Sequence, residues 1–253
     1  MSGTLIALIT AGCVFSGTLI GLALSKLLPA HHLTADSKDA VKMGAGMITM
    51  MAALVLGLLV SSAKSTFDST NAAITQVGAK VILMDRLLAN YGPETKEVRE
   101  TLRRMVTAGI EMLWPEESPT ELGVMSFERA AAMEKLLQQM RGLKPQTGAQ
   151  QALQAQALAL GNEILLTRWL QIEQAYVPLP LPFVVILLFW LTLLYTSFGL
   201  LAPRNATVLT IMFLGALAVA TALFLIVEMN RPMAGAIKVS SAPMRNALEH
   251  IGR

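Results

Sequence analysis

Apolar positions divide the chain into four long segments without ionised side chains and one long polar segment. The uncharged segments are residues 1–25, 43–63, 174–203 and 205–227. About 20 apolar residues are enough for a helix to cross a hydrocarbon core of about 30 Å. Backbone groups inside lipid must be hydrogen-bonded within the chain, which favours helices. We therefore predict an all-α polytopic membrane protein with four transmembrane helices, at residues 4–24, 43–63, 183–202 and 206–227.

The segment between the second and third apolar segments, residues 64–176, has a different composition. It carries 12 of the 20 basic and 13 of the 17 acidic residues. It lacks the alternation typical of strands, so we predict a helical extramembrane insert. Its first helix continues the second span without a break, and Gly92 caps it before Pro93 starts the next. Further helices are expected at 93–114, 126–141 and 147–176.

The predicted organisation therefore has four parts. Residues 1–63 form the first two transmembrane helices with their connecting loop, and residues 64–176 form the helical insert. Residues 177–227 form the third and fourth transmembrane helices, and residues 228–253 form a C-terminal tail.

Composition supports a membrane protein and argues against several other classes. Charged residues make up 15% of the chain, against about 25% in soluble domains. The net charge of +3 is too small to indicate a nucleic-acid partner. The single cysteine, Cys13, rules out an internal disulfide and a cysteine-built metal site.

No enzymatic or metal-binding motif stands out in the sequence. His31 and His32 lie near Asp36 and Asp39, a set that could bind a transition metal. Adjacent histidines point in different directions on most backbones, so we expect a solvated loop, no metal and no cofactor. The chain has no phosphate-binding glycine loop, nucleophile elbow or zinc-protease motif, and we do not expect an enzyme.

The second span carries two faces that could serve a pore or a helix contact. The first is bulky and ends in serines, and steps of three and four residues keep it on one side of a helix. Its members are Met47, Met51, Leu54, Leu58, Ser61 and Ser65. A ring of such side chains could gate a pore by dewetting, and Lys64 beside it could attract anions. The same residues also fit ordinary packing and lipid-facing positions.

The second face of this span is small and weakly polar. It consists of Gly46, Thr49, Ala53 and Gly57. We expect one of the two faces to pack within the protomer and the other to meet neighbouring subunits or a pore. In the first span, the spacing of Gly17 and Gly21 permits close helix contact.

The orientation in the membrane does not follow from charge. Four spans place both termini on one side. The short loops on one side hold four basic residues and the two termini hold four, so the positive-inside rule gives a tie.

Several short stretches resemble a bacterial membrane family of unknown function that is sometimes called bestrophin-like. They are residues 28–33, 52–59, 62–65, 83–88, 91–94, 198–200, 202–207 and 240–243. Bestrophins are pentameric anion channels with four spans, cytoplasmic termini and a helical cytosolic part between spans two and three. The resemblance implies the same plan here, in the bacterial inner membrane. The bestrophin aromatic neck has no clear counterpart, because methionines and leucines occupy the equivalent face.

These observations lead to two functional hypotheses. The first is an oligomeric ion channel, a pentamer if it follows the bestrophin plan, that conducts anions and has the second span at the pore. The second is a non-conducting membrane sensor or scaffold whose helical insert binds a protein partner. Assembly distinguishes them, because a channel with so few polar residues in its spans needs a symmetric oligomer around an axis.

Overall fold

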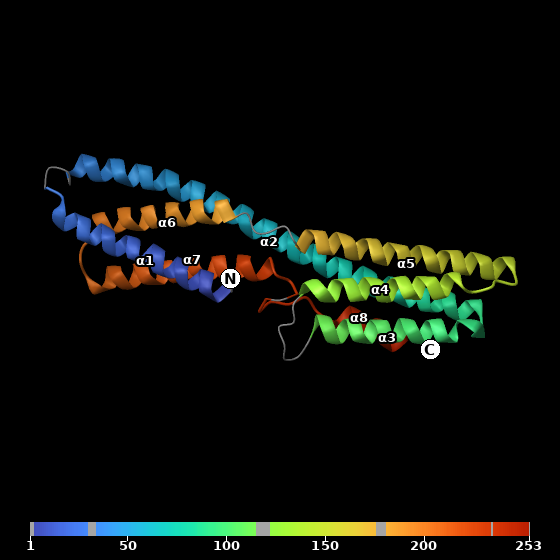
Figure 1. The fold of residues 1–253 in the computed structure, drawn as a ribbon. Helices are drawn as coiled ribbons and strands as arrows, with labels where there is room; N and C mark the ends of the chain where they lie inside the picture. The colour runs from blue at the N-terminus through green and yellow to red at the C-terminus, as the bar shows by residue number, and fades with distance from the viewer. Residues whose placement is uncertain (1–2, 30–33, 115–121, 176–180, 234, 253) are drawn as a thin grey trace. The chain divides into compact units, whose positions relative to one another are not determined.

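The computed structural model describes residues 3–29, 34–114, 122–175, 181–233 and 235–252, and it contains no strand among them (Figure 1). The helices are, in chain order, α1 (Gly3–Leu27), α2 (Ala35–Tyr91), the 3-10 helix η2 (Pro93–Thr95), α3 (Lys96–Leu113), α4 (Leu122–Arg141), α5 (Gly148–Ala175), α6 (Leu181–Leu201), α7 (Ala206–Met229) and α8 (Ala242–His250). Helices α1, α2, α6 and α7 are each long and apolar enough to cross a membrane. The sequence-based prediction of four long apolar helices in an all-helical chain is therefore confirmed.

Most of the predicted helix boundaries agree with the structure to within a few residues. Helix α2 runs unbroken for 57 residues, and Gly92 follows it with a φ of 139°. A glycine readily adopts this left-handed region, which explains the sharp end of the helix before Pro93. The predicted start of α4 at Ser126 is wrong, since the helix begins at Leu122. A serine is tolerated inside a helix, and the preceding Leu122 and Met125 are strong helix formers.

The chain divides into two compact units, which we describe separately. The apolar unit contains Met1–Phe67, Pro178–Arg231 and Gly235–Ile237. The polar unit contains Asp68–Val177, Pro232–Ala234 and Lys238–Arg253.

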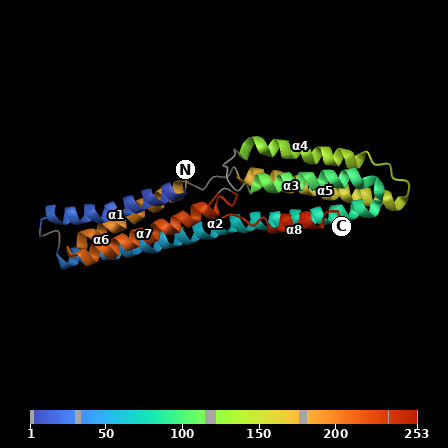
Figure 2. The same cartoon turned by 90° about the horizontal axis from the view of Figure 1, so that it is seen from below.

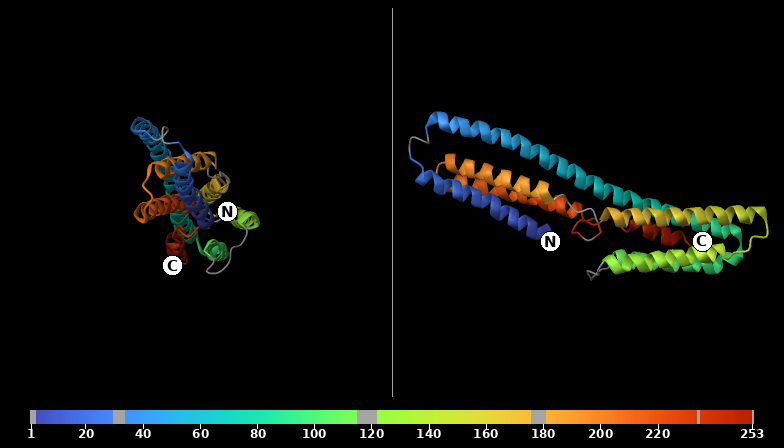
Figure 3. Two further views of the ribbon diagram at one scale, coloured as in Figure 1. Left: turned by 90° about the vertical axis from the view of Figure 1, so that its left-hand side faces the viewer. Right: turned by 45° about the horizontal axis from the view of Figure 1, so that its top comes forward.

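In the apolar unit, α1 packs closely against α6 and α7 (Figure 3). Glycines bring α1 and α6 together, as the sequence predicts for Gly17 and Gly21. A Cβ atom added to Gly17 would lie 2.6 Å from the backbone oxygen of Thr192. A Cβ atom on Gly21 or Gly199 would also collide with the backbone of the opposite helix. These positions therefore require glycine for the two helices to approach so closely.

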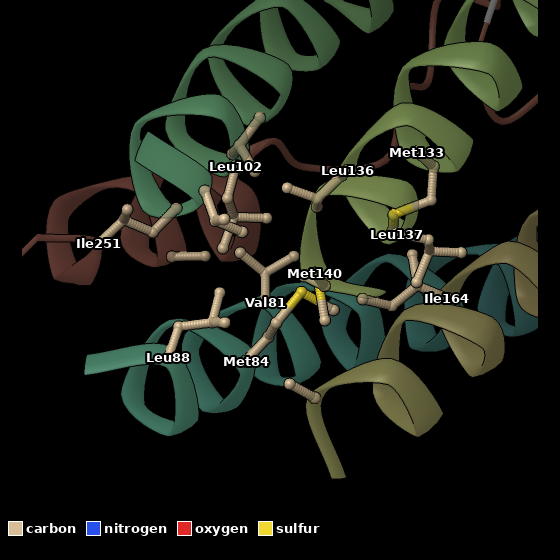
Figure 4. Packing of buried hydrophobic residues seen from close by; sticks show 14 of the residues in the cluster. Val81, Met84, Leu88, Leu102, Met133, Leu136, Leu137, Met140, Ile164 and Ile251 are labelled. Atoms are coloured by element: carbon tan, nitrogen blue, oxygen red, sulfur yellow. The ribbon is translucent and has the colours of Figure 1, made fainter. Parts of the chain in front are cut away.

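The polar unit has a core of aliphatic and methionine side chains from the second part of α2 and from α3, α4, α5 and α8 (Figure 4). Helix α8 lies along α2, where a Cβ atom on Gly78 would come within 2.9 Å of the Pro243 oxygen (Figure 2). The Trp114 indole donates to the Val239 oxygen at 2.7 Å, which holds the chain before α8 in place. Fully or almost fully buried members of the core include Val81, Met84, Leu88, Leu102, Met133, Leu136, Leu137, Met140 and Ile251.

One buried carboxylate joins three parts of the polar unit. Asp85, on α2, is 1% exposed. Its two oxygens accept hydrogen bonds from Nε and Nη2 of Arg99 on α3, at 2.8 and 2.9 Å. The backbone N–H of Gly252, just after α8, donates to the same carboxylate at 3.2 Å. The hydrogen bonds with Asp85 raise the pKa of Arg99, although burial acts in the opposite direction, so the arginine stays charged.

Candidate pore-lining face of α2

Helix α2 enters the apolar unit at a capped N-terminus. The backbone N–H of Ser37 donates to the side-chain oxygen of Thr34, directly before the helix. Asp36 lies in the first turn, where a negative charge interacts favourably with the helix dipole. The sequence contains no helix breaker from there to Gly92 other than isolated glycines, which a helix tolerates.

The face of α2 that packs within the protomer is built mainly from alanine. Ala45, Ala52, Leu59 and Ala63 are buried and belong to a cluster with side chains of α6 and α7. Small side chains let apolar helices approach closely in the absence of water. This face is neither the bulky face nor the small stripe proposed from the sequence.

The bulky face is exposed along its whole length. Met47, Leu54 and Leu58 are 70%, 66% and 62% exposed, respectively. Met51, Ser61 and Ser65 are exposed as well. Since a helix turns about 100° per residue, Leu54 lies about 160° from the buried Ala52. The structure thus brings all six predicted residues to the side of α2 that faces away from the protomer core.

The small stripe is also exposed, which corrects the expectation that one of the two faces packs inside the protomer. Gly46, Ala53 and Gly57 are all exposed, and a Cβ atom added to either glycine would meet no atom within 4 Å. The expectation was wrong because it considered only these two faces. A third face, rich in alanine, packs in the protomer instead.

Charged groups lie just beyond the apolar part of this surface. Lys64 is exposed beside Ser61 and Ser65. Lys42, one residue before the predicted second span, pairs with Asp39 at 2.9 Å on the exterior. The exposed surface of α2 thus passes from apolar side chains to a polar end formed by Ser61, Lys64 and Ser65.

Glu228 is a buried polar residue whose environment the sequence does not reveal. It lies in the last turn of α7 and is 6% exposed. Its carboxylate accepts a hydrogen bond from the backbone N–H of Ala236. It also lies so close to Gly3 and Gly235 that a Cβ atom at either would collide with it. The side chain therefore fixes the start of α1 and the chain after α7 against the end of α7.

The residues suggested for a metal site are only partly described. His31 and His32 lie outside the described residues. Elsewhere in the described chain, no three histidine, cysteine or carboxylate side chains gather in a group that could hold a metal ion.

Comparison with known proteins agrees with this architecture. The structure is similar to those of two point variants of a bacterial bestrophin homologue from Klebsiella pneumoniae. One matches with a TM-score of 0.61 at 16% sequence identity, covering 97% of this chain and 99% of the other. The second matches with a TM-score of 0.65 at 14% identity, covering 95% and 99%.

The sequence comparisons identify the family directly. No curated protein matches the chain. The model of the bestrophin-like domain matches residues 12–244, which is most of the sequence. The chain therefore belongs to the bestrophin-like family.

Proposed function

We propose that the protein forms an oligomeric membrane ion channel that conducts anions, with α2 lining the pore. The observation that carries the proposal is the exposed bulky face of α2, directly opposite the face that packs in the protomer. Several copies around a symmetry axis would turn this face into stacked apolar rings. The family supports the proposal, because its resemblance to bestrophins implies a channel with the second span at the pore.

The same face provides a physical basis for gating. Narrow rings of methionine and leucine exclude water, and an ion without water meets a high barrier. Ser61 and Ser65 would give the constriction a polar mouth. Lys64 next to them would raise the local concentration of anions. The serines and Lys64 therefore favour anions over cations at this end of the pore.

The proposed topology follows the four long apolar helices. We assign α1, the first part of α2, α6 and α7 as four spans in the bacterial inner membrane. The helical insert and both termini lie in the cytoplasm in this assignment, and five subunits form the ring. The orientation rests on the resemblance, since the positive-inside count gives a tie.

Single-channel recordings in planar bilayers test the pore-lining face. Leu54→Ser should wet the constriction and raise conductance. Leu56→Ser is the matched control, since Leu56 lies about 200° away and packs against the core of the apolar unit. Lys64→Glu should shift selectivity toward cations. If the two leucine variants behave alike and Lys64→Glu has no effect, α2 does not line the pore.

A second candidate function has its own observation in the polar unit. Leu166, Trp169 and Leu170 form an exposed apolar patch at helical spacing on α5. Such a patch suits contact with another protein, as a scaffold or sensor would require. A stable monomer that produces no ion flux in liposomes would favour this alternative over the channel.

A further inference from the structure

The apolar unit contains a pocket that the proposed pore does not use. It has a volume of about 680 Å³ and lies between the end of α1, the α6–α7 connection and the start of α7. Most of its wall is apolar, formed by Leu19, Leu22, Ala23, Leu27 and Leu209. Two cationic side chains, Lys26 and Arg204, complete the wall together with Asn205 and Ala206.

The two cations of the pocket have no acidic partner among the described side chains. Arg204 donates from Nη2 to Oγ of Ser25 at 2.9 Å and to the oxygen of Leu22 at 3.4 Å, both uncharged groups. Within the described parts of the chain, neither Lys26 nor Arg204 forms a salt bridge. The pocket therefore has a net positive charge and would attract an anion.

The start of α7 adds to this positive potential. Asn205 is the N-cap and accepts the N–H of Val208 at 2.8 Å through its side chain. Ala206, the first residue of the helix, lines the pocket. The N-terminus of a helix carries a partial positive charge and unpaired backbone N–H groups, which favour phosphate.

The apolar wall indicates where such an anion comes from. Leu27 is 78% exposed and Leu19 is 49% exposed, and both belong to a helix that is long and apolar enough to cross a membrane. A free phosphate ion has no apolar group that could contact this surface, whereas the acyl chains of a phospholipid would cover it. Cationic side chains at the ends of spans lie at the depth of lipid headgroups. Charge and apolar surface together therefore match an anionic phospholipid.

We propose that this pocket binds an anionic phospholipid, with its phosphate between Lys26 and Arg204 and its acyl chains along the leucines of α1 and α7. The bound lipid would join α1 to the α6–α7 connection. The proposal does not depend on ion conduction, so it can fail or hold independently of the proposed function.

Native mass spectrometry of the delipidated, full-length protein tests the proposal with phosphatidylglycerol and phosphatidylcholine as probes. Phosphatidylglycerol should bind more tightly than phosphatidylcholine. One basic residue near an anionic lipid surface raises the affinity for the lipid about fivefold. Lys26→Gln should therefore weaken phosphatidylglycerol binding by about this factor. The double variant Lys26→Gln/Arg204→Gln should weaken it about thirtyfold.

Two control variants separate charge from folding and from general surface attraction. Arg204→Lys keeps the charge and should retain most of the binding. Lys42→Gln removes an exposed lysine that lies outside the pocket and should leave binding unchanged.

Three results would overturn the proposal. Equal binding of the two lipids would show that the negative charge of the lipid does not contribute to binding. Unchanged phosphatidylglycerol binding in Lys26→Gln would show that the lipid sits elsewhere, as it would if a neighbouring subunit filled the pocket. Displacement of the lipid by millimolar inorganic phosphate would show a site for the free anion.

Discussion

The buried carboxylate of Asp85 offers a test of how the polar unit is held together. Asp85→Asn keeps the shape of the side chain but removes its charge. Arg99 then loses its ionic partner, although its side chain is only 22% exposed. The hydrogen bond from Gly252 also loses a charged acceptor.

The magnitude follows from the burial of the two partners. Breaking a fully buried ion pair costs about 3–5 kcal/mol. Because Arg99 retains some access to water, we expect a loss of about 2–3 kcal/mol in the free energy of unfolding. For a unit of this size, that loss corresponds to a fall of roughly 10 °C in the melting temperature. The raised pKa of Arg99 keeps it charged well above neutral pH, so the loss should be the same throughout the neutral range.

Thermal unfolding of the purified protein, followed by circular dichroism, measures this effect. Lys80→Gln is the matched control, because Lys80 pairs with Glu163 at 3.2 Å and the glutamate is 57% exposed. Lys80 is 24% exposed and Arg99 22%, so the two pairs differ mainly in their carboxylates. A pair whose carboxylate remains in water contributes about 0–1 kcal/mol. If Asp85→Asn and Lys80→Gln melt at the same temperature, the carboxylate does not hold α2, α3 and the C-terminal residues together.

Two further predictions concern the apolar unit and the topology. Gly199→Ala should force α1 and α6 apart and lower the free energy of unfolding by about 1–3 kcal/mol. Gly12→Ala, whose new methyl group meets open space, should not lower the melting temperature. Equal melting temperatures of the two variants would contradict the close helix contact. In intact cells, a membrane-impermeant thiol reagent should label Lys38→Cys from outside and should label Glu97→Cys only after permeabilisation. Labelling of Glu97→Cys in intact cells would reverse the proposed orientation.

Much of the fold could be predicted because its strongest signals are local. Long uncharged segments identified the four apolar helices, and Gly92 followed by Pro93 identified the end of α2. The buried face of α2 could not be predicted in this way. Every face of an apolar helix is apolar, so periodicity gives no contrast, and the choice of Ala45 and Ala52 depends on how closely α6 and α7 approach.

The contacts of the buried Glu228 could not be predicted from the sequence, for a related reason. Glu228 stands at the end of an apolar segment with Arg231 three residues on, where the sequence favours an ion pair between the two at the membrane surface. Its burial depends on Gly3, at the other end of the chain, and on the loop at Gly235. A contact between residues as distant in sequence as Gly3 and Glu228 leaves no local pattern, and a single sequence contains no other signal for it.

Anion flux through the purified protein tests the central claim most directly. The full chain is reconstituted into liposomes loaded with potassium chloride, and chloride efflux is followed after dilution into a chloride-free buffer that contains valinomycin, so that potassium efflux balances the charge. We expect efflux well above that of empty liposomes, and faster efflux with Leu54→Ser than with Leu56→Ser. An assembled oligomer that releases no more chloride than empty liposomes, with either variant, would contradict the channel and favour the scaffold.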